Sequence, residues 1–188
     1  MSGGLIALIV VVVIVLIAVL WYISTRNGII SFRNRVEESW SGIDVQLKRR
    51  HDLVPNLVET VKGYATHEQQ VFENVTEARA KAMASTGVED TAKTESALTR
   101  AMADLRAVAE NYPDLKATEN FQQLSRNLSE LEDEIQASRR IYNSNVQGYN
   151  TKIQQFPASI VANQGGFQAK EFFEIADASE RETPSVSF

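Results

Sequence analysis

The side chains best suited to acid–base or metal chemistry are few in this sequence and far apart. The chain has two histidines, His51 and His67, and no cysteine. The histidines lie in a segment with helical periodicity, about 24 Å apart along a straight helix. A zinc site needs three or four convergent ligands. The signatures H-E-x-x-H and G-x-S-x-G and the phosphate-binding loop are absent. We therefore predict no catalytic residue, no metal site, no cofactor and no small-molecule substrate.

Tyrosine and asparagine side chains recur on the apolar stripe of the longest expected helix. The pair Tyr142-Asn143 is repeated seven residues later as Tyr149-Asn150, with Asn145 between the two pairs. Buried tyrosine hydroxyls and asparagine amides need hydrogen-bond partners. The pattern predicts a polar layer across a helical bundle that specifies helix register, and a ligand cleft is the alternative.

Two charged residues, Arg50 and Glu68, fall at positions of an apolar stripe that begins at Val36 and advances in alternating steps of four and three. One explanation is that each residue lies near a local helix break or extends its side chain out of the stripe. The other is that the two residues form a paired polar layer that fixes helix register.

The carboxylates Glu130, Glu132, Asp133 and Glu134 crowd one helix, and we interpret them as a solvated face.

The spacing of apolar residues predicts three long helices. The first covers 33–84, with a kink near 52–55 because Pro55 removes a backbone donor. The second covers about 94–111 and ends at Pro113, and the third covers about 117–156. Beyond the Gly165-Gly166 break we expect a short amphipathic helix containing Phe172, Phe173 and Ile175. Its aromatic side chains would cap the bundle or dock a partner.

Residues Leu5 to Ile23 form an uncharged apolar run that spans about 28 Å as a helix, close to the ~30 Å hydrocarbon thickness of a bilayer. We predict an uncleaved membrane anchor rather than a buried core helix. The segment after the run either lies among lipid headgroups or continues the anchor helix outward. The expected membrane-interface residues are Trp21, Tyr22, Arg26, Ile29, Ile30, Phe32 and Arg33.

Arg26, Arg33 and Arg35 follow the anchor closely, and four uncharged residues precede it. By the positive-inside rule, we expect a single-pass protein of the bacterial inner membrane with residues 24–188 in the cytoplasm. The charge bias is small, so a periplasmic or extracellular location of that part stays the alternative.

Composition favours an all-α protein. The chain has 24 acidic and 19 basic residues, for a net charge of -5, which argues against nucleic-acid binding. Glycine and proline are sparse, at 9 and 4 residues. We predict an N-terminal transmembrane helix followed by an antiparallel up-and-down bundle of long helices. The expected divisions are 1–25 for the anchor, 26–157 for the bundle, and 158–188 for a short helix and an extended tail that packs on or near it.

Several ordered motifs resemble those of the LemA family. They are WSGIDVQLKRRHDLVPNLVETVKGYATHE from Trp40, EAR from Glu77, YPDLKATENFQQL from Tyr112, RRIYNSNVQGYN from Arg139 and FP from Phe156. The resemblance implies a membrane-anchored helical bundle without established enzymatic activity. One relative takes part in magnetosome membrane formation, and family genes often neighbour those of membrane proteases.

These observations lead to two functional hypotheses. The first is a non-enzymatic scaffold that self-assembles as a homo-oligomer at the lipid bilayer. The second is an adaptor for another membrane protein, such as a membrane protease. A ligand sensor built on the tyrosine–asparagine layer is a third class.

Overall fold

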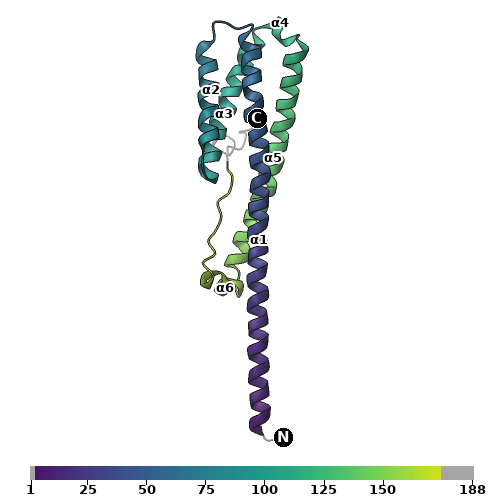
Figure 1. The fold of residues 1–188 in the computed structure, drawn as a ribbon, viewed down its shortest axis with the longest axis vertical. Helices are drawn as coiled ribbons and strands as arrows, with labels where there is room; N and C mark the ends of the chain where they lie inside the picture. Colours follow the sequence, from purple (N-terminus) through teal and green to yellow (C-terminus); the bar gives the residue numbers. More distant parts are fainter. Residues whose placement is uncertain (1–2, 175–188) are drawn as a thin grey trace, which may run out of the picture. The chain divides into compact units, whose positions relative to one another are not determined.

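The computed structural model describes residues 3–174, and these residues form six helices and no strand. The helices are α1 (Gly3–Lys62), α2 (Gln69–Ala84), α3 (Val88–Glu110), α4 (Pro113–Lys116), α5 (Glu119–Gln154) and α6 (Ala158–Gln164) (Figure 1). The all-α fold class predicted from the sequence is confirmed.

The described residues divide into two compact units. Unit 1 contains residues 3–40 and 142–170, and unit 2 contains residues 41–141 and 171–174. Helices α1 and α5 each contribute one part to unit 1 and another to unit 2.

Unit 2 is an antiparallel bundle built from residues 41–62 of α1, all of α2 and α3, and residues 119–141 of α5, with α4 as a short connection (Figure 1). Its core is apolar because each helix turns one stripe inward. Fully buried members of this core include Leu57, Val61, Val75, Leu98, Leu105, Leu115 and Leu128.

Unit 1 pairs residues 3–40 of α1 with residues 142–154 at the end of α5. A Cβ atom on Gly148 would lie 3.2 Å from the Phe32 ring, so the absence of a side chain at 148 lets the two helices approach closely. Ile29, Val146 and Val161 are completely buried in this unit. The apolar run Leu5 to Ile23 belongs to α1, and its most apolar window is not covered by any other described part of the chain.

Several expected helix boundaries are wrong. The single helix 33–84 is two helices, because the chain leaves α1 at Gly63 and forms a turn before α2. Helix α1 also runs through Gly28 as a continuation of the apolar run, which was one of the two alternatives for that segment. It continues through Pro55 as well, where the adjacent Val54 and Leu57 are buried.

The helix expected at about 94 starts at Val88. The backbone N–H of Thr86 donates to the Asp90 carboxylate at 3.1 Å, and the Thr91 hydroxyl donates to the Gly87 carbonyl at 2.7 Å. These local hydrogen bonds start α3 inside a segment that lacks apolar periodicity.

The expected helix after Gly166 is wrong. The short helix α6 lies before the glycine pair, and residues 167–174 are not helical. Phe173 is buried in unit 2, where the Arg139 guanidinium lies 5.3 Å from its ring centroid. Ile175 lies outside the described residues.

Candidate functional site

A buried ionic cluster joins the helices of unit 2. Arg50 on α1 is 2% exposed and pairs with two carboxylates, Glu95 on α3 and Glu132 on α5. The Arg50 Nη1 atom lies 2.8 Å from Glu132 Oε1 and donates to the Thr99 hydroxyl at 3.2 Å. Because two carboxylates surround the guanidinium, its charge is compensated inside the bundle.

His51 extends this cluster. Its Nε2 atom lies 2.6 Å from Glu95 Oε1, and the Nε atom of Arg79 on α2 donates to the His51 carbonyl at 2.7 Å. Burial, followed by the positive charges of Arg50 and Arg79, lowers the pKa of His51 to about 4. The imidazole is therefore neutral at pH 7, and its Nε2–H donates to Glu95.

The cluster lies beside a cavity of about 240 Å³ within unit 2, which Asp44, Lys48, Ser85 and Thr91 also line. Among the described residues, no group of three or more histidine or acidic side chains could hold a metal ion. The cluster draws residues from all four long helices of the unit. Its geometry suits it to fix how these helices pair.

The two charged residues of the apolar stripe do not meet. Glu68 lies just before α2, where its backbone carbonyl accepts hydrogen bonds from the N–H groups of Val71 and Phe72. Arg50 instead pairs with acidic residues of other helices. One of these, Glu132, belongs to the acidic run that we interpreted as a solvated face, so that interpretation is wrong at this position.

The tyrosine–asparagine residues cluster near the end of α5. The Tyr142 ring is buried and lies 5.4 Å from the Trp40 ring, centroid to centroid, in a tilted arrangement. Asn145 donates to the Arg35 carbonyl at 3.4 Å, while Asn143 is half-buried. These contacts place Tyr142 and Asn145 at the packing surface between α1 and α5 inside unit 1.

Asn150 holds the extended segment that follows α6. Its Nδ2 donates to the Lys170 carbonyl at 2.9 Å, and its Oδ1 accepts from the Lys170 backbone N–H at 2.8 Å. The neighbouring Tyr149 is buried, and burial raises its pKa. Together, Tyr149 and Asn150 support a pocket of unit 1.

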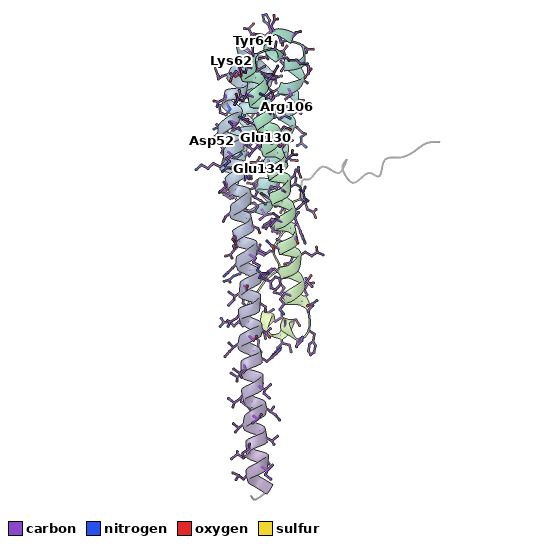
Figure 2. All side chains as sticks on the ribbon, turned by 90° about the vertical axis from the view of Figure 1, so that its right-hand side faces the viewer. Asp52, Lys62, Tyr64, Arg106, Glu130 and Glu134 are labelled. Carbon is purple, nitrogen blue, oxygen red and sulfur yellow. The ribbon has the colours of Figure 1, made fainter. Side chains whose placement is uncertain are left out.

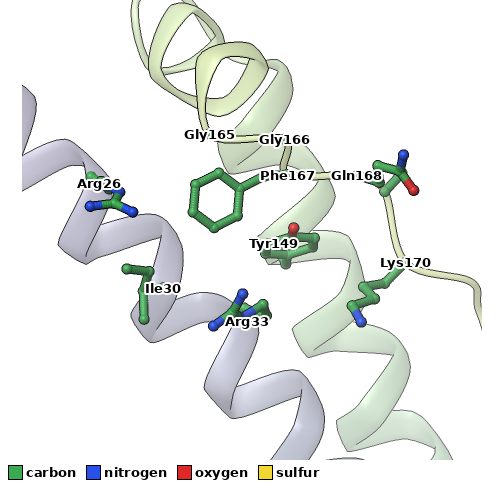
Figure 3. Close-up of a pocket in the computed structure, with 10 residues that line it drawn as sticks. Arg26, Ile30, Arg33, Tyr149, Gly165, Gly166, Phe167, Gln168 and Lys170 are labelled. Atoms are coloured by element: carbon green, nitrogen blue, oxygen red, sulfur yellow. The ribbon is translucent and has the colours of Figure 1, made fainter.

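That pocket has a volume of about 390 Å³. Figure 3 shows Arg26, Ile30 and Arg33 on its α1 side, with Tyr149 and Phe167 projecting from the side formed by α5 and the segment after α6. Lys170 is a further lining residue. Sequence reasoning marked the glycine pair at 165–166 as a break but did not identify this pocket.

The remaining membrane-interface candidates differ in exposure. Trp21 is 39% exposed, and Tyr22 and Phe32 are half-buried. Ile29 is completely buried, so its contacts are with protein rather than lipid.

A family model described as the LemA family matches residues 39–188. The chain belongs to the LemA family. Protein LemA of Metamycoplasma hominis is 30% identical over 168 residues, which cover 85% of this chain and 76% of the relative. Magnetosome protein MamQ 2 of Paramagnetospirillum magneticum is 23% identical over 187 residues, or 86% of this chain and 68% of the relative. Magnetosome protein MamQ of Magnetospirillum gryphiswaldense is 21% identical with the same coverage.

The part that matches the LemA family contains the whole ionic cluster of unit 2, but only part of the pocket of unit 1. Arg26, Ile30 and Arg33 precede residue 39, where the match begins. The pocket is therefore built from the family domain together with the segment that links it to the apolar run.

Proposed function

We propose that this LemA-family protein is a non-enzymatic, membrane-anchored scaffold that self-assembles in the bacterial cytoplasmic membrane. One observation carries the proposal: the apolar run of α1 is uncovered around its whole circumference, with side chains from Leu5 to Leu20 that are 45–67% exposed. Such a surface needs lipid or other apolar helices around it. Anchored chains are also confined to two dimensions, which raises their effective concentration.

The names of two relatives support a role in membrane organisation. Both are called magnetosome proteins. The buried Arg50 cluster agrees with a structural role, because its charges are paired between helices.

Single-cysteine crosslinking in membranes tests self-assembly. The chain has no native cysteine, so every crosslink comes from the introduced residue. Cysteine is placed at one position at a time from Val10 to Ile17 of the full-length protein. A packed anchor interface predicts crosslinking that rises and falls with a helical period of three to four residues. Sizing of the full-length protein in mild detergent should then give discrete particles of many subunits. Uniform, weak crosslinking together with monomers in detergent would refute the scaffold.

A second function, an adaptor for another membrane protein, has its own support. A groove of about 340 Å³ on unit 2 is lined by two leucines, three acidic residues, one arginine and one asparagine: Leu53, Leu131, Asp52, Glu130, Glu134, Arg49 and Asn127. Figure 2 shows Asp52, Glu130 and Glu134 close together on α1 and α5. This arrangement suits an amphipathic segment with basic residues. Monomers in both membranes and detergent would favour the adaptor.

We also propose that residues 24–188 face the cytoplasm, because arginines follow the anchor. The exposed Lys93 of α3 offers a reporter position. A Lys93→Cys variant in intact spheroplasts should resist a membrane-impermeant maleimide and react with it after lysis. Labelling before lysis would reverse the assigned orientation.

A further inference from the structure

The pocket of unit 1 is cationic. Arg26, Arg33 and Lys170 line it, and no aspartate or glutamate is among its described lining residues. Glu37 lies outside the lining, with its Oε1 atom 3.7 Å from Arg33 Nε. Three positive charges around one concave space form a site for an anion.

The glycine turn after α6 shapes this pocket. A Cβ atom on Gly165 would lie 2.5 Å from the Phe167 ring, and Gly166 has a φ of +68°, which favours glycine. The turn thus folds Phe167 back into the pocket wall, where the Arg33 guanidinium lies 5.9 Å from its ring centroid. This contact orients the Arg33 side chain.

The pocket begins just beyond the apolar run. Arg26 follows Ile23 by three residues, or about 4.5 Å along α1, and Arg33 follows it by about 15 Å. The headgroup layer on each side of a bilayer is about 5–8 Å thick. When the apolar run spans the hydrocarbon, the Arg26 end of the pocket lies at the level of lipid headgroups.

A second feature lies at the same level. Gly28 faces Lys152, and Phe32 faces Gly148, so α1 and α5 run in opposite directions with matching steps of four residues. By the same spacing Gln154, where α5 ends, lies level with residue 26, and Phe156 follows two residues later in the turn before α6. Phe156 is 82% exposed, and Ile160 on α6 is 48% exposed. Exposed apolar side chains at this level suit the boundary between headgroups and acyl chains of a membrane that α1 spans.

We propose that this pocket binds the phosphate of an anionic membrane lipid. Arg26, at the level of the headgroups, contacts the phosphate, Arg33 and Lys170 add positive charge further along the pocket, and the lipid tails extend beside Phe156 into the bilayer. The proposal requires membrane anchoring but not self-assembly. Free inorganic phosphate has the same chemistry as the headgroup. The exposed apolar side chains at this level favour the lipid, because a free ion would not need them.

Lipid exchange on the full-length protein tests this site. The protein in mixed micelles of phosphatidylglycerol and phosphatidylcholine is analysed by native mass spectrometry to measure which lipid it retains. The variant Arg33→Gln/Lys170→Gln removes two of the three charges, and Arg106→Gln/Arg126→Gln removes two exposed arginines of unit 2 as a matched control. The single variant Lys170→Gln serves as a second pocket variant that should keep the fold. The hydrogen bonds from Asn150 involve only the backbone of Lys170, so they do not depend on its side chain.

We expect preferential retention of phosphatidylglycerol by the wild type. Each basic residue near an anionic surface contributes about fivefold, so the preference should fall about 25-fold in the double variant and about fivefold in Lys170→Gln. The control should match the wild type. Equal retention of both lipids by the wild type, or an unchanged preference in both pocket variants, would overturn the proposal. Displacement of the lipid by millimolar inorganic phosphate would also overturn it, in favour of free phosphate as the ligand.

Discussion

The neutral state of buried His51 makes the stability of the protein depend on pH. Its pKa is about 4 in the folded protein, against 6.5 for an ordinary histidine. In the unfolded chain the imidazole gains a proton as pH falls through 6.5, whereas the folded protein resists protonation until about pH 4. The unfolded state is therefore favoured progressively as pH falls through this window.

The size of the effect follows from the pKa difference. A pKa difference of this size corresponds to about 3 kcal/mol of unfolding free energy, present in full above pH 6.5 and lost by about pH 4. Solvent screening is small, because the His51 side chain is 10% exposed. Replacement of His51 by glutamine keeps an N–H donor for Glu95 and removes the titration.

The assay is urea unfolding of the full-length protein in detergent between pH 4 and pH 8. Carboxylates that titrate in the same range are common to both proteins, so the difference between wild type and His51→Gln isolates the histidine. His67→Gln, at an exposed position in the turn before α2, serves as the control and should follow the wild-type profile. The chain has two histidines, so NMR can assign the titration of His51 directly. Parallel profiles for wild type and His51→Gln, or an imidazole that titrates at 6.5 or above, would refute this reasoning.

Two further predictions use matched pairs of neighbouring or similar residues. Arg50→Met leaves the buried Glu95 carboxylate uncompensated and should lower the unfolding free energy by about 3–5 kcal/mol, whereas Arg49→Met, at an exposed ion pair, should cost less than about 1 kcal/mol. Equal costs in urea unfolding would contradict the burial argument. Asn150→Ala releases the backbone of Lys170, so trypsin should cleave after that lysine much faster, and Asn127→Ala on the exposed face of α5 should leave the rate unchanged. The same rate in both variants would mean that Asn150 does not hold this segment.

Helical periodicity predicted the elements of this fold well, since a repeat of 3.5 residues specifies both helix and buried face. It failed at the turn between α1 and α2, because the spacing of apolar residues continues unchanged across this turn. The apolar positions continue through Val61 and Val71 as though one helix connected them, although the chain turns between the two. Gly63 was visible in the sequence, but a glycine inside a helical pattern permits a break without requiring one.

The candidate sites were predicted less completely, because each depends on contacts between distant segments. The stripe identified Arg50 as an unusual inward position, yet its partners come from residues 45 and 82 positions further along the chain. Periodicity shows which face of a helix is buried, not which side chain of another helix lies opposite. The pocket of unit 1 likewise joins Arg33 to Lys170 through a glycine turn that the sequence marks only as a break.

The ionic cluster can specify the register in which the helices pair, which the apolar core alone cannot do. The core pattern repeats every seven residues, as in Leu124 and Leu131 of α5, so α5 could slip by one repeat and still present leucine to the core. The same slip would replace Glu132 opposite Arg50 by Ser125 or Arg139.

A slip of α3 has the same effect, because it would replace Glu95 by Val88 or Met102. Either slip leaves the Arg50 charge buried without one of its carboxylates, which costs several kcal/mol. We infer that the cluster specifies helix register at some cost in stability.

The triple variant Arg50→Leu/Glu95→Leu/Glu132→Leu tests this inference. It should equal or exceed the wild type in unfolding free energy, because leucine needs no charge compensation in the core. It should also give several amide NMR signals per residue where the wild type gives one, because the apolar core alone accepts more than one register. A single native-like set of signals in the variant would show that the core sets the register without the cluster.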